Sequence, residues 1–118
     1  MNWKQKIGNW GQELAKEYLL QKGYQFINQN FHSRFGEVDL IFYDQDQLVF
    51  VEVKTRTSAA YGLPEEAITE SKKEKLVQTA LEYLDKNEIA DDNFRLDCLA
   101  IELDSENQVA KIRHHRAI

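Results

Sequence analysis

The sequence contains a single cysteine, a single proline and no apolar run long enough to cross a membrane. One cysteine, Cys98, cannot form a disulfide within the chain, and this is typical of a protein that folds in a reducing cytosol. A transmembrane helix needs about 20 consecutive apolar residues, and neither such a run nor an N-terminal signal peptide is found. We therefore expect a cytoplasmic protein with no membrane partner, in which Cys98 is a small core residue rather than a nucleophile.

The chain also lacks internal repeats, low-complexity segments, a glycine-rich phosphate loop and an excess of positive charge. The 15 Lys and Arg residues face 20 Asp and Glu residues, so the net charge is −5 and the isoelectric point is about 5.2. This balance argues against a general nucleic-acid binder, because such affinity comes mostly from neutralising phosphates. With 118 residues, 42% of them hydrophobic, the chain is long enough for one compact domain over residues 1–118 and too short for two.

What the sequence does contain is charge inside apolar, strand-like runs. Asp39 lies in the run 38–43, and Glu52 and Lys54 lie in and just after the run 48–53. Both runs are rich in β-branched and aromatic residues, which favours strands, and the polar residues 44–47 between them favour a turn. The two runs therefore predict an antiparallel hairpin. Burying a charged group without a partner is costly, so the three charges need an explanation.

The register of this hairpin determines whether the charges meet. A turn centred between Gln45 and Asp46 brings Asp39 opposite Glu52, with Cβ atoms roughly 4.5–5.5 Å apart. Side chains alternate along a strand, so Lys54 then lies on the same face as Glu52. A three-residue loop would shift the register by one and turn Asp39 to the other face.

Facing carboxylates repel one another unless a cation joins them. Mg²⁺ or Mn²⁺ suits such a pair, because hard ions prefer oxygen ligands and keep waters for substrate phosphates. Lys54 would position or deprotonate an attacking water, or stabilise charge on the phosphorus centre. The hypothesis is therefore a site that cleaves phosphodiesters, and the alternative is a buried ion cluster of Asp39, Glu52 and Lys54 that only fixes the strand register.

The remaining pattern predicts the order of the elements. We expect a helix at 9–22, strands at 24–28, 38–43 and 48–53, a helix that begins after Thr69 or Ser71, and strands at 94–103 and 109–113. A polar loop is predicted at 30–35 and a polar segment at 55–60. The residues 61–64, which include the only proline, are predicted to interrupt the regular secondary structure. Helices flanking a central mixed β-sheet define an α/β (α+β) sandwich.

The motifs in this framework resemble those of a known group, the YraN family of small bacterial proteins in the restriction-endonuclease-like superfamily with the PD-(D/E)xK signature. The likeness covers almost the whole chain. The motifs that carry it are Gly8-x-x-Gly11-x-Glu13, Gly36-Glu37-Val38-Asp39-Leu40-Ile41, Phe50-Val51-Glu52-Val53-Lys54-Thr55-Arg56, Gly62-x-Pro64-x-x-Ala67, Lys72, Ala80-x-x-Tyr83-Leu84 and Phe94-Arg95-x-Asp97.

The resemblance implies a restriction-endonuclease-like fold and a metal-dependent endonuclease. The catalytic pattern of the superfamily maps onto Asp39, Glu52 and Lys54, with Val38 where the signature has proline. Archaeal Holliday junction resolvases are similar in layout, and a glutamate on their first helix joins the metal site. Glu13 matches that role, so the implied ligands of Mg²⁺ (or Mn²⁺) are Asp39, Glu52 and Glu13.

The expected partner is nucleic acid, most readily DNA with a branched or damaged structure. Arg56, Lys72 and Arg34 are the residues expected to contact phosphates. Two alternatives stay open: a nucleic-acid-binding module that does not cleave, and a protein-interaction domain whose buried charges are structural. The sequence does not distinguish DNA from RNA, nor a monomer from a homodimer.

Overall fold

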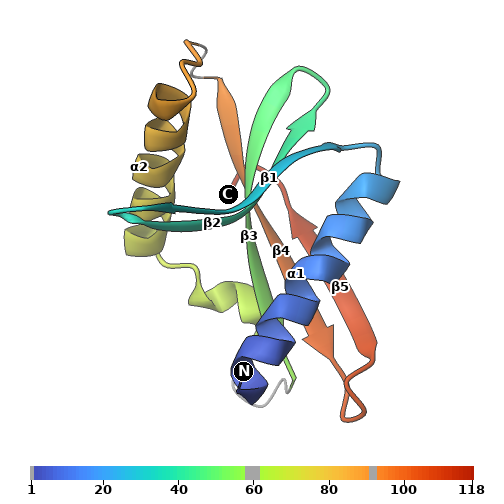
Figure 1. Ribbon diagram of the computed structural model, residues 1–118. Coiled ribbons are helices and arrows are strands. Elements are labelled where there is room, and N and C mark those ends of the chain that lie inside the picture. The colour runs from blue at the N-terminus through green and yellow to red at the C-terminus, as the bar shows by residue number, and fades with distance from the viewer. Residues whose placement is uncertain (1, 58–61, 91–92) are drawn as a thin grey trace.

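The computed structural model describes residues 2–57, 62–90 and 93–118, and within them a five-stranded mixed sheet lies between two α-helices (Figure 1). The elements are α1 (Trp3–Gln21), β1 (Gln25–Ser33), β2 (Gly36–Asp44), β3 (Gln47–Arg56), the 3-10 helix η2 (Pro64–Ala67), α2 (Glu70–Lys86), β4 (Phe94–Leu103) and β5 (Val109–His115). The strand order is β1-β2-β3-β4-β5, and only the β3–β4 pair is parallel. The predicted element order and the α/β (α+β) class are confirmed, and the architecture is compatible with a restriction-endonuclease-like fold.

Helix α1 begins six residues earlier than predicted, at Trp3 instead of residue 9. The cause is a capping box: the Gln5 backbone N–H donates to Asn2 Oδ1 (2.8 Å), and the Asn2 backbone N–H donates to Gln5 Oε1 (3.0 Å). These reciprocal bonds satisfy two N–H groups that a helix start leaves without partners. The Asn-x-x-Gln pattern was the available signal for this start.

The prediction at 24–28 was too short, because β1 continues to Ser33 through residues predicted to form a loop. This strand is at the edge of the sheet, and its exposed and half-buried positions alternate, so its polar residues face solvent while Phe31 packs inward. For α2, Thr69 is the cap, and its side chain accepts from the Lys72 N–H at 3.2 Å. Residues 58–61, which belong to the predicted polar segment and the predicted interruption after it, lie outside the described residues.

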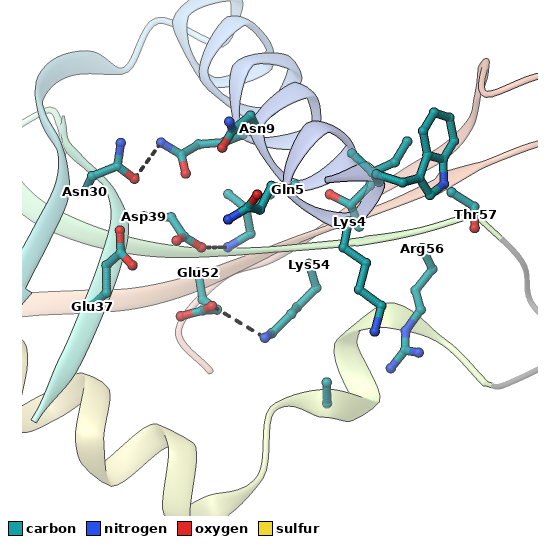
Figure 2. Close-up of a pocket in the computed structure, with 17 residues that line it drawn as sticks. Lys4, Gln5, Asn9, Asn30, Glu37, Asp39, Glu52, Lys54, Arg56 and Thr57 are labelled. Carbon is teal, nitrogen blue, oxygen red and sulfur yellow. Dashed lines mark hydrogen bonds and ion pairs between the residues drawn. The ribbon is translucent and has the colours of Figure 1, made fainter. Parts of the chain in front are cut away.

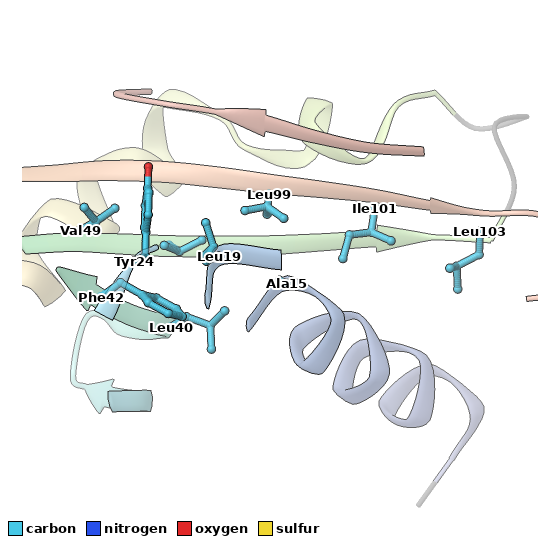
Figure 3. Close-up of a cluster of buried hydrophobic side chains, with 10 residues drawn as sticks. Ala15, Leu19, Tyr24, Leu40, Phe42, Val49, Leu99, Ile101 and Leu103 are labelled. Atoms are coloured by element: carbon cyan, nitrogen blue, oxygen red, sulfur yellow. The ribbon is translucent and has the colours of Figure 1, made fainter. Parts of the chain in front are cut away.

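Two hydrophobic clusters fill the two faces of the sheet. Helix α1 covers the cluster drawn in Figure 3, whose buried members are Ala15, Leu19, Tyr24, Leu40, Phe42, Val49, Val51, Leu99, Ile101 and Leu103. Helix α2 covers the other, in which the Tyr83 ring lies edge-on to Phe50, with centroids 5.6 Å apart. Cys98 is buried, and burial raises the pKa of its thiol to about 12, as expected for a core residue.

The basic residues near the C-terminus are held in ion pairs. Asp97 is fully buried and accepts from Arg95 Nε (2.8 Å), His114 Nε2 (2.8 Å) and the Ala117 N–H (3.0 Å). Arg113 forms a separate set of ion pairs with Glu65 and Glu102. We call the group of Asp97, Arg95 and His114 the Asp97 cluster.

Neither helix α1 nor any other helix among the described residues is long and apolar enough to span a bilayer.

Candidate active site

The site forms where strands β2 and β3 separate. Their pairing runs from Asp44–Gln47 next to the turn as far as Leu40–Val51. The turn is therefore the two-residue connection Gln45–Asp46, with Gln45 at a positive φ of 56°. This is the register predicted from the sequence, and the next residues along the two strands are Asp39 and Glu52.

Asp39 compensates for the loss of backbone pairing at this point. Its Oδ2 accepts a hydrogen bond of 2.8 Å from the Val53 N–H. The carboxylate thus supplies an acceptor where the ladder of the sheet has ended. Burial raises the pKa of Asp39 above its ordinary value, and the bond from Val53 only partly opposes this effect.

Glu52 is the least satisfied carboxylate of the site. Its side chain is only 6% exposed, and its Oε1 lies 3.7 Å from Lys54 Nζ, longer than an ordinary hydrogen bond. Its Oε2 is buried and has no hydrogen-bond partner among the described residues. Burial, and then the negative charge of Asp39, raise the pKa of Glu52 to about 7. Figure 2 shows both carboxylates and the contact with Lys54.

Lys54 lies in the same partly buried, charged environment. Its side chain is 24% exposed. Burial lowers the pKa of the Lys54 ammonium group, and the nearby Lys72 of α2 lowers it further, although Glu52 acts in the opposite direction. A lysine in this setting releases its proton more readily than a solvated one.

Two hollows reach the carboxylates. The first, here called the α1 cavity, measures about 620 Å³ and is lined by the first half of α1, by Asn30, by the adjoining ends of β2 and β3, and by Ala67 of η2 (Figure 2). The second, the α2 hollow, measures about 310 Å³ and is lined in part by Lys72 and Lys75 of α2. Glu37, Asp39 and Glu52 line both, so these carboxylates are accessible from two directions.

The structure brings together most of the predicted site residues. Asp39, Glu52 and Lys54 meet as predicted, Arg56 lines the α1 cavity, and Lys72 lines the α2 hollow. None of the cations Arg56, Lys72 and Lys4 forms an ion pair with another described residue.

Two predicted residues do not join them. Glu13 is exposed on α1 and lines neither hollow; its neighbour Gln12 lines the α1 cavity instead. Arg34 is exposed at the β1–β2 turn, with its guanidinium 4.9 Å from the centroid of the Phe35 ring, and it also lines neither hollow. Within residues 2–57, 62–90 and 93–118, no group of three or more His, Cys, Asp and Glu side chains is arranged to hold a metal ion.

The sequence interpretation missed the wall that α1 contributes. This wall comprises Trp3, Lys4, Gln5, Ile7, Gly8, Asn9 and Gln12. Its position depends on Gly11: a Cβ there would lie 1.9 Å from Thr55 Oγ1, so only glycine allows α1 to approach β3 this closely. Gly11 was the available signal for a close contact between helix and strand, whereas a Cβ on Gly8 would meet no atom within 4 Å.

Comparison with known proteins places the chain in a family. Residues 11–101 match the sequence profile described as "Uncharacterised protein family UPF0102". A UPF0102 protein of Syntrophomonas wolfei is 51% identical over 79 residues, which are 67% of this chain and 69% of that protein. A UPF0102 protein of Herpetosiphon aurantiacus is 40% identical over 119 residues, covering 98% of this chain and 94% of that protein. One from Caldanaerobacter subterraneus is 38% identical over 112 residues, covering 94% and 92%. The chain therefore belongs to the uncharacterised protein family UPF0102, of which YraN is another name.

Proposed function

We propose that this protein is a metal-dependent endonuclease that hydrolyses phosphodiester bonds in DNA. The observation that carries the proposal is the state of Glu52: a buried carboxylate with one oxygen lacking a partner, a raised pKa and a second carboxylate beside it. Perturbed titratable groups that line a cavity are characteristic of functional sites. Glu82 of α2 also has a buried oxygen without a partner among the described residues, but Glu82 lines neither hollow, so the cavity and the neighbouring Asp39 are what distinguish Glu52.

The donors fit a hard divalent cation. Asp39 and Glu52 would hold Mg²⁺ or Mn²⁺ through carboxylate oxygens, the ligands these ions prefer. A cation would also satisfy Glu52 Oε2 and offset the repulsion that raises the pKa of Glu52. Glu37 lines both hollows, but no third carboxylate among the described residues is placed to complete the set, so the remaining ligands would be waters or substrate phosphate oxygens. The ion, when bound, supplies Lewis-acid activation of phosphate and water.

Lys54 is the proposed partner of the attacking water. Its ammonium group already lies near Glu52, and its lowered pKa eases exchange of a proton with a water in the cavity. While protonated, it donates hydrogen bonds to the phosphate oxygens on which negative charge grows during the reaction.

Arg56 and Lys72 are the proposed phosphate contacts. They line the two hollows around the carboxylates, and neither forms an ion pair with another described residue. The net charge of −5 therefore does not prevent a local cationic surface, because several other bases, such as Arg95 and Arg113, are neutralised in ion pairs.

A cleavage screen tests the proposal. Wild-type protein is incubated with branched, flapped, single-stranded and duplex DNA, and with matching RNA, in Mg²⁺ and in Mn²⁺. We expect metal-dependent cleavage of at least one DNA, and its loss in Glu52→Gln. The matched control is Glu82→Gln, because Glu82 of α2 also has a buried oxygen without a partner among the described residues and lines neither hollow. No cleavage of any substrate with either metal would contradict the proposal.

Binding measured with Ca²⁺ in place of Mg²⁺ tests the phosphate contacts separately. On duplex DNA, the logarithm of affinity falls with the logarithm of salt concentration by roughly 0.9 for each phosphate contacted. Lys72→Ala should reduce this slope by about one unit. Lys111→Ala, on the exposed part of β5, should leave it unchanged.

A further inference from the structure

Both tryptophans of the chain are on α1 and are exposed to solvent. Trp3 is 60% exposed and Trp10 is 38% exposed. Trp3 lines the α1 cavity, whereas Trp10 lines neither hollow. Neither residue belongs to the hydrophobic clusters or packs against them. Trp3 is therefore a large, exposed apolar side chain in the lining of the α1 cavity that has no role in the core.

We propose that Trp3 stacks on an unpaired nucleobase, so that the substrate of the site contains a single-stranded segment. This inference rests on the proposed function. An aromatic face stacks on any base and is a common platform for single strands. In the interior of a duplex, each base face is covered by its neighbours, so stacking on a side chain away from the duplex ends requires a flap, a junction with unpaired bases, a gap or a displaced base.

The surroundings of Trp3 supply the other contacts that a single strand needs. Lys4 follows Trp3 on α1, and Arg56 lies on β3; both side chains line the same cavity (Figure 2). Cations in an aromatic-containing groove neutralise the backbone while the ring engages the base. Together with Trp3, they provide a base contact and phosphate contacts within a single cavity.

The wall of the cavity adds neutral hydrogen-bonding groups. Gln5 and Gln12 of α1 line it together with Asn30 of β1, and Gln12 Nε2 donates to Asn30 Oδ1 at 2.9 Å. Amide side chains carry both donors and acceptors, which match the edges of unstacked bases. A surface that bound only phosphates would be lined mainly by cationic side chains rather than by amides.

Removing Trp3 should leave the fold intact. The start of α1 is fixed by the capping box of Asn2 and Gln5, which does not involve the indole. The helix is held to the sheet by Ala15 and Leu19, together with Ile7, Leu14 and Tyr18. Binding can therefore be measured on variants of Trp3 without a confounding loss of structure, and thermal melting verifies this for each variant.

The test uses tryptophan fluorescence with Ca²⁺ present. In Trp10→Phe, Trp3 is the only reporter; in Trp3→Phe, Trp10 is the only one. Each is titrated with a single-stranded oligonucleotide, a flapped duplex and a blunt duplex. We expect the Trp3 signal to be quenched by the single strand and the flap and to change little with the blunt duplex. The Trp10 signal should stay constant in all three titrations.

Affinity gives the second measurement. Trp3→Ala should weaken binding of the single strand and the flap on the order of tenfold, with the same salt dependence as wild type because no phosphate contact is lost. Trp10→Ala is the matched control and should bind as wild type does. An unquenched Trp3 signal in a protein that binds single strands, or an equal loss of affinity on the blunt duplex, would overturn the inference while leaving the proposed function standing. If the wild type binds none of the three substrates, the inference fails, and the cleavage screen, which includes branched DNA, decides separately whether the proposed function stands.

Discussion

Two buried carboxylates on neighbouring strands have opposite electrostatic surroundings. Asp97 of β4 pairs in register with Val51, the residue just before Glu52 of β3, and alternation along the strands turns the two carboxylates to opposite faces of the sheet. Burial alone would raise the pKa of Asp97, but hydrogen bonds from His114, Arg95 and the Ala117 N–H outweigh it and lower the pKa to about 2. For Glu52 nothing comparable offsets burial, and its pKa rises to about 7.

The difference separates a charge cluster whose hydrogen bonds are complete from one whose hydrogen bonds are not. Both Asp97 oxygens accept hydrogen bonds, and this cluster joins β4 to β5 and to the C-terminal residues. Glu52 has one distant cation and one oxygen without a partner among the described residues. The alternative of a buried ion cluster that only fixes the fold thus describes Asp97 well and Glu52 poorly. The fold provides hydrogen-bond partners for both oxygens of Asp97 and leaves one oxygen of Glu52 without a partner. The protein therefore tolerates a loss of stability at Glu52.

The largest expected effect is the loss of protein stability when the Asp97 cluster is disrupted. Arg95→Ala leaves Asp97 buried without its main cation and should destabilise the protein by about 3–5 kcal/mol. Lys54→Ala should cost less than about 1 kcal/mol, because its pairing with Glu52 is long and Glu52 can take up a proton instead. Urea denaturation at pH 7 measures both. The matched control is Arg116→Ala, whose exposed pair with Asp44 should contribute little. If Lys54→Ala is as destabilising as Arg95→Ala, the Glu52 site is structural as well.

The next effect is a pH dependence that Glu52 imposes. Its folded-state pKa of about 7 is above the ordinary 4.5, so the folded state holds the proton more tightly than the unfolded state does. Stability should therefore fall as pH rises from about 4.5 through 7, by up to about 3 kcal/mol. Glu52→Gln cannot ionise and should be more stable than wild type at pH 8. Metal-free denaturation curves from pH 4.5 to 8 provide the measurement, and superimposable profiles for the two proteins would contradict the account.

The smallest of these effects is the pH dependence of stability that comes from Asp97, and its sign is opposite to that from Glu52. The pKa of Asp97 is about 2 in the folded state and 3.8 ordinarily, so its contribution to stability is present above pH 3.8 and disappears as pH falls toward 2. The loss should be about 2 kcal/mol. Asp97→Asn should be less stable than wild type at pH 7, and the gap should narrow between pH 4 and 2. A constant gap across that range would show that Asp97 does not retain its charge in the folded state.

Much of the fold was predictable because local signals agree with the tertiary structure. Runs rich in β-branched and aromatic residues indicated β2 and β3. Of the two registers that the sequence left open, the structure has the turn centred between Gln45 and Asp46, which brings Asp39 and Glu52 together. The edge strand β1 was predicted too short, because an edge strand with one solvated face carries polar residues that resemble a loop. The early start of α1 was missed because residues 3–10, which follow the Asn2 cap, contain a single half-buried residue, Ile7. One such residue does not make the apolar stripe from which a helix is predicted.

The site was less predictable than the fold. Pairing of Asp39 with the Val53 N–H arises because the two strands diverge, and no sequence pattern encodes that divergence. The orientation of α1 determines which of its side chains enter the cavity. In the orientation that α1 has, Gln12 lines the α1 cavity and the adjacent Glu13 does not. Helix periodicity from the apolar stripe alone is too coarse to distinguish two adjacent residues near the boundary of a face.

The central claim is that Asp39 and Glu52 together bind a divalent cation, and thermal unfolding with and without Mn²⁺ tests it most directly. An ion that binds only the folded state stabilises it by about 2.7 kcal/mol at a hundredfold excess over Kd. We predict that Mn²⁺ raises the Tm of the wild type and of the control Glu82→Gln, and raises that of Asp39→Asn by clearly less. Equal shifts in the wild type and in Asp39→Asn, or no shift in either, would contradict the account.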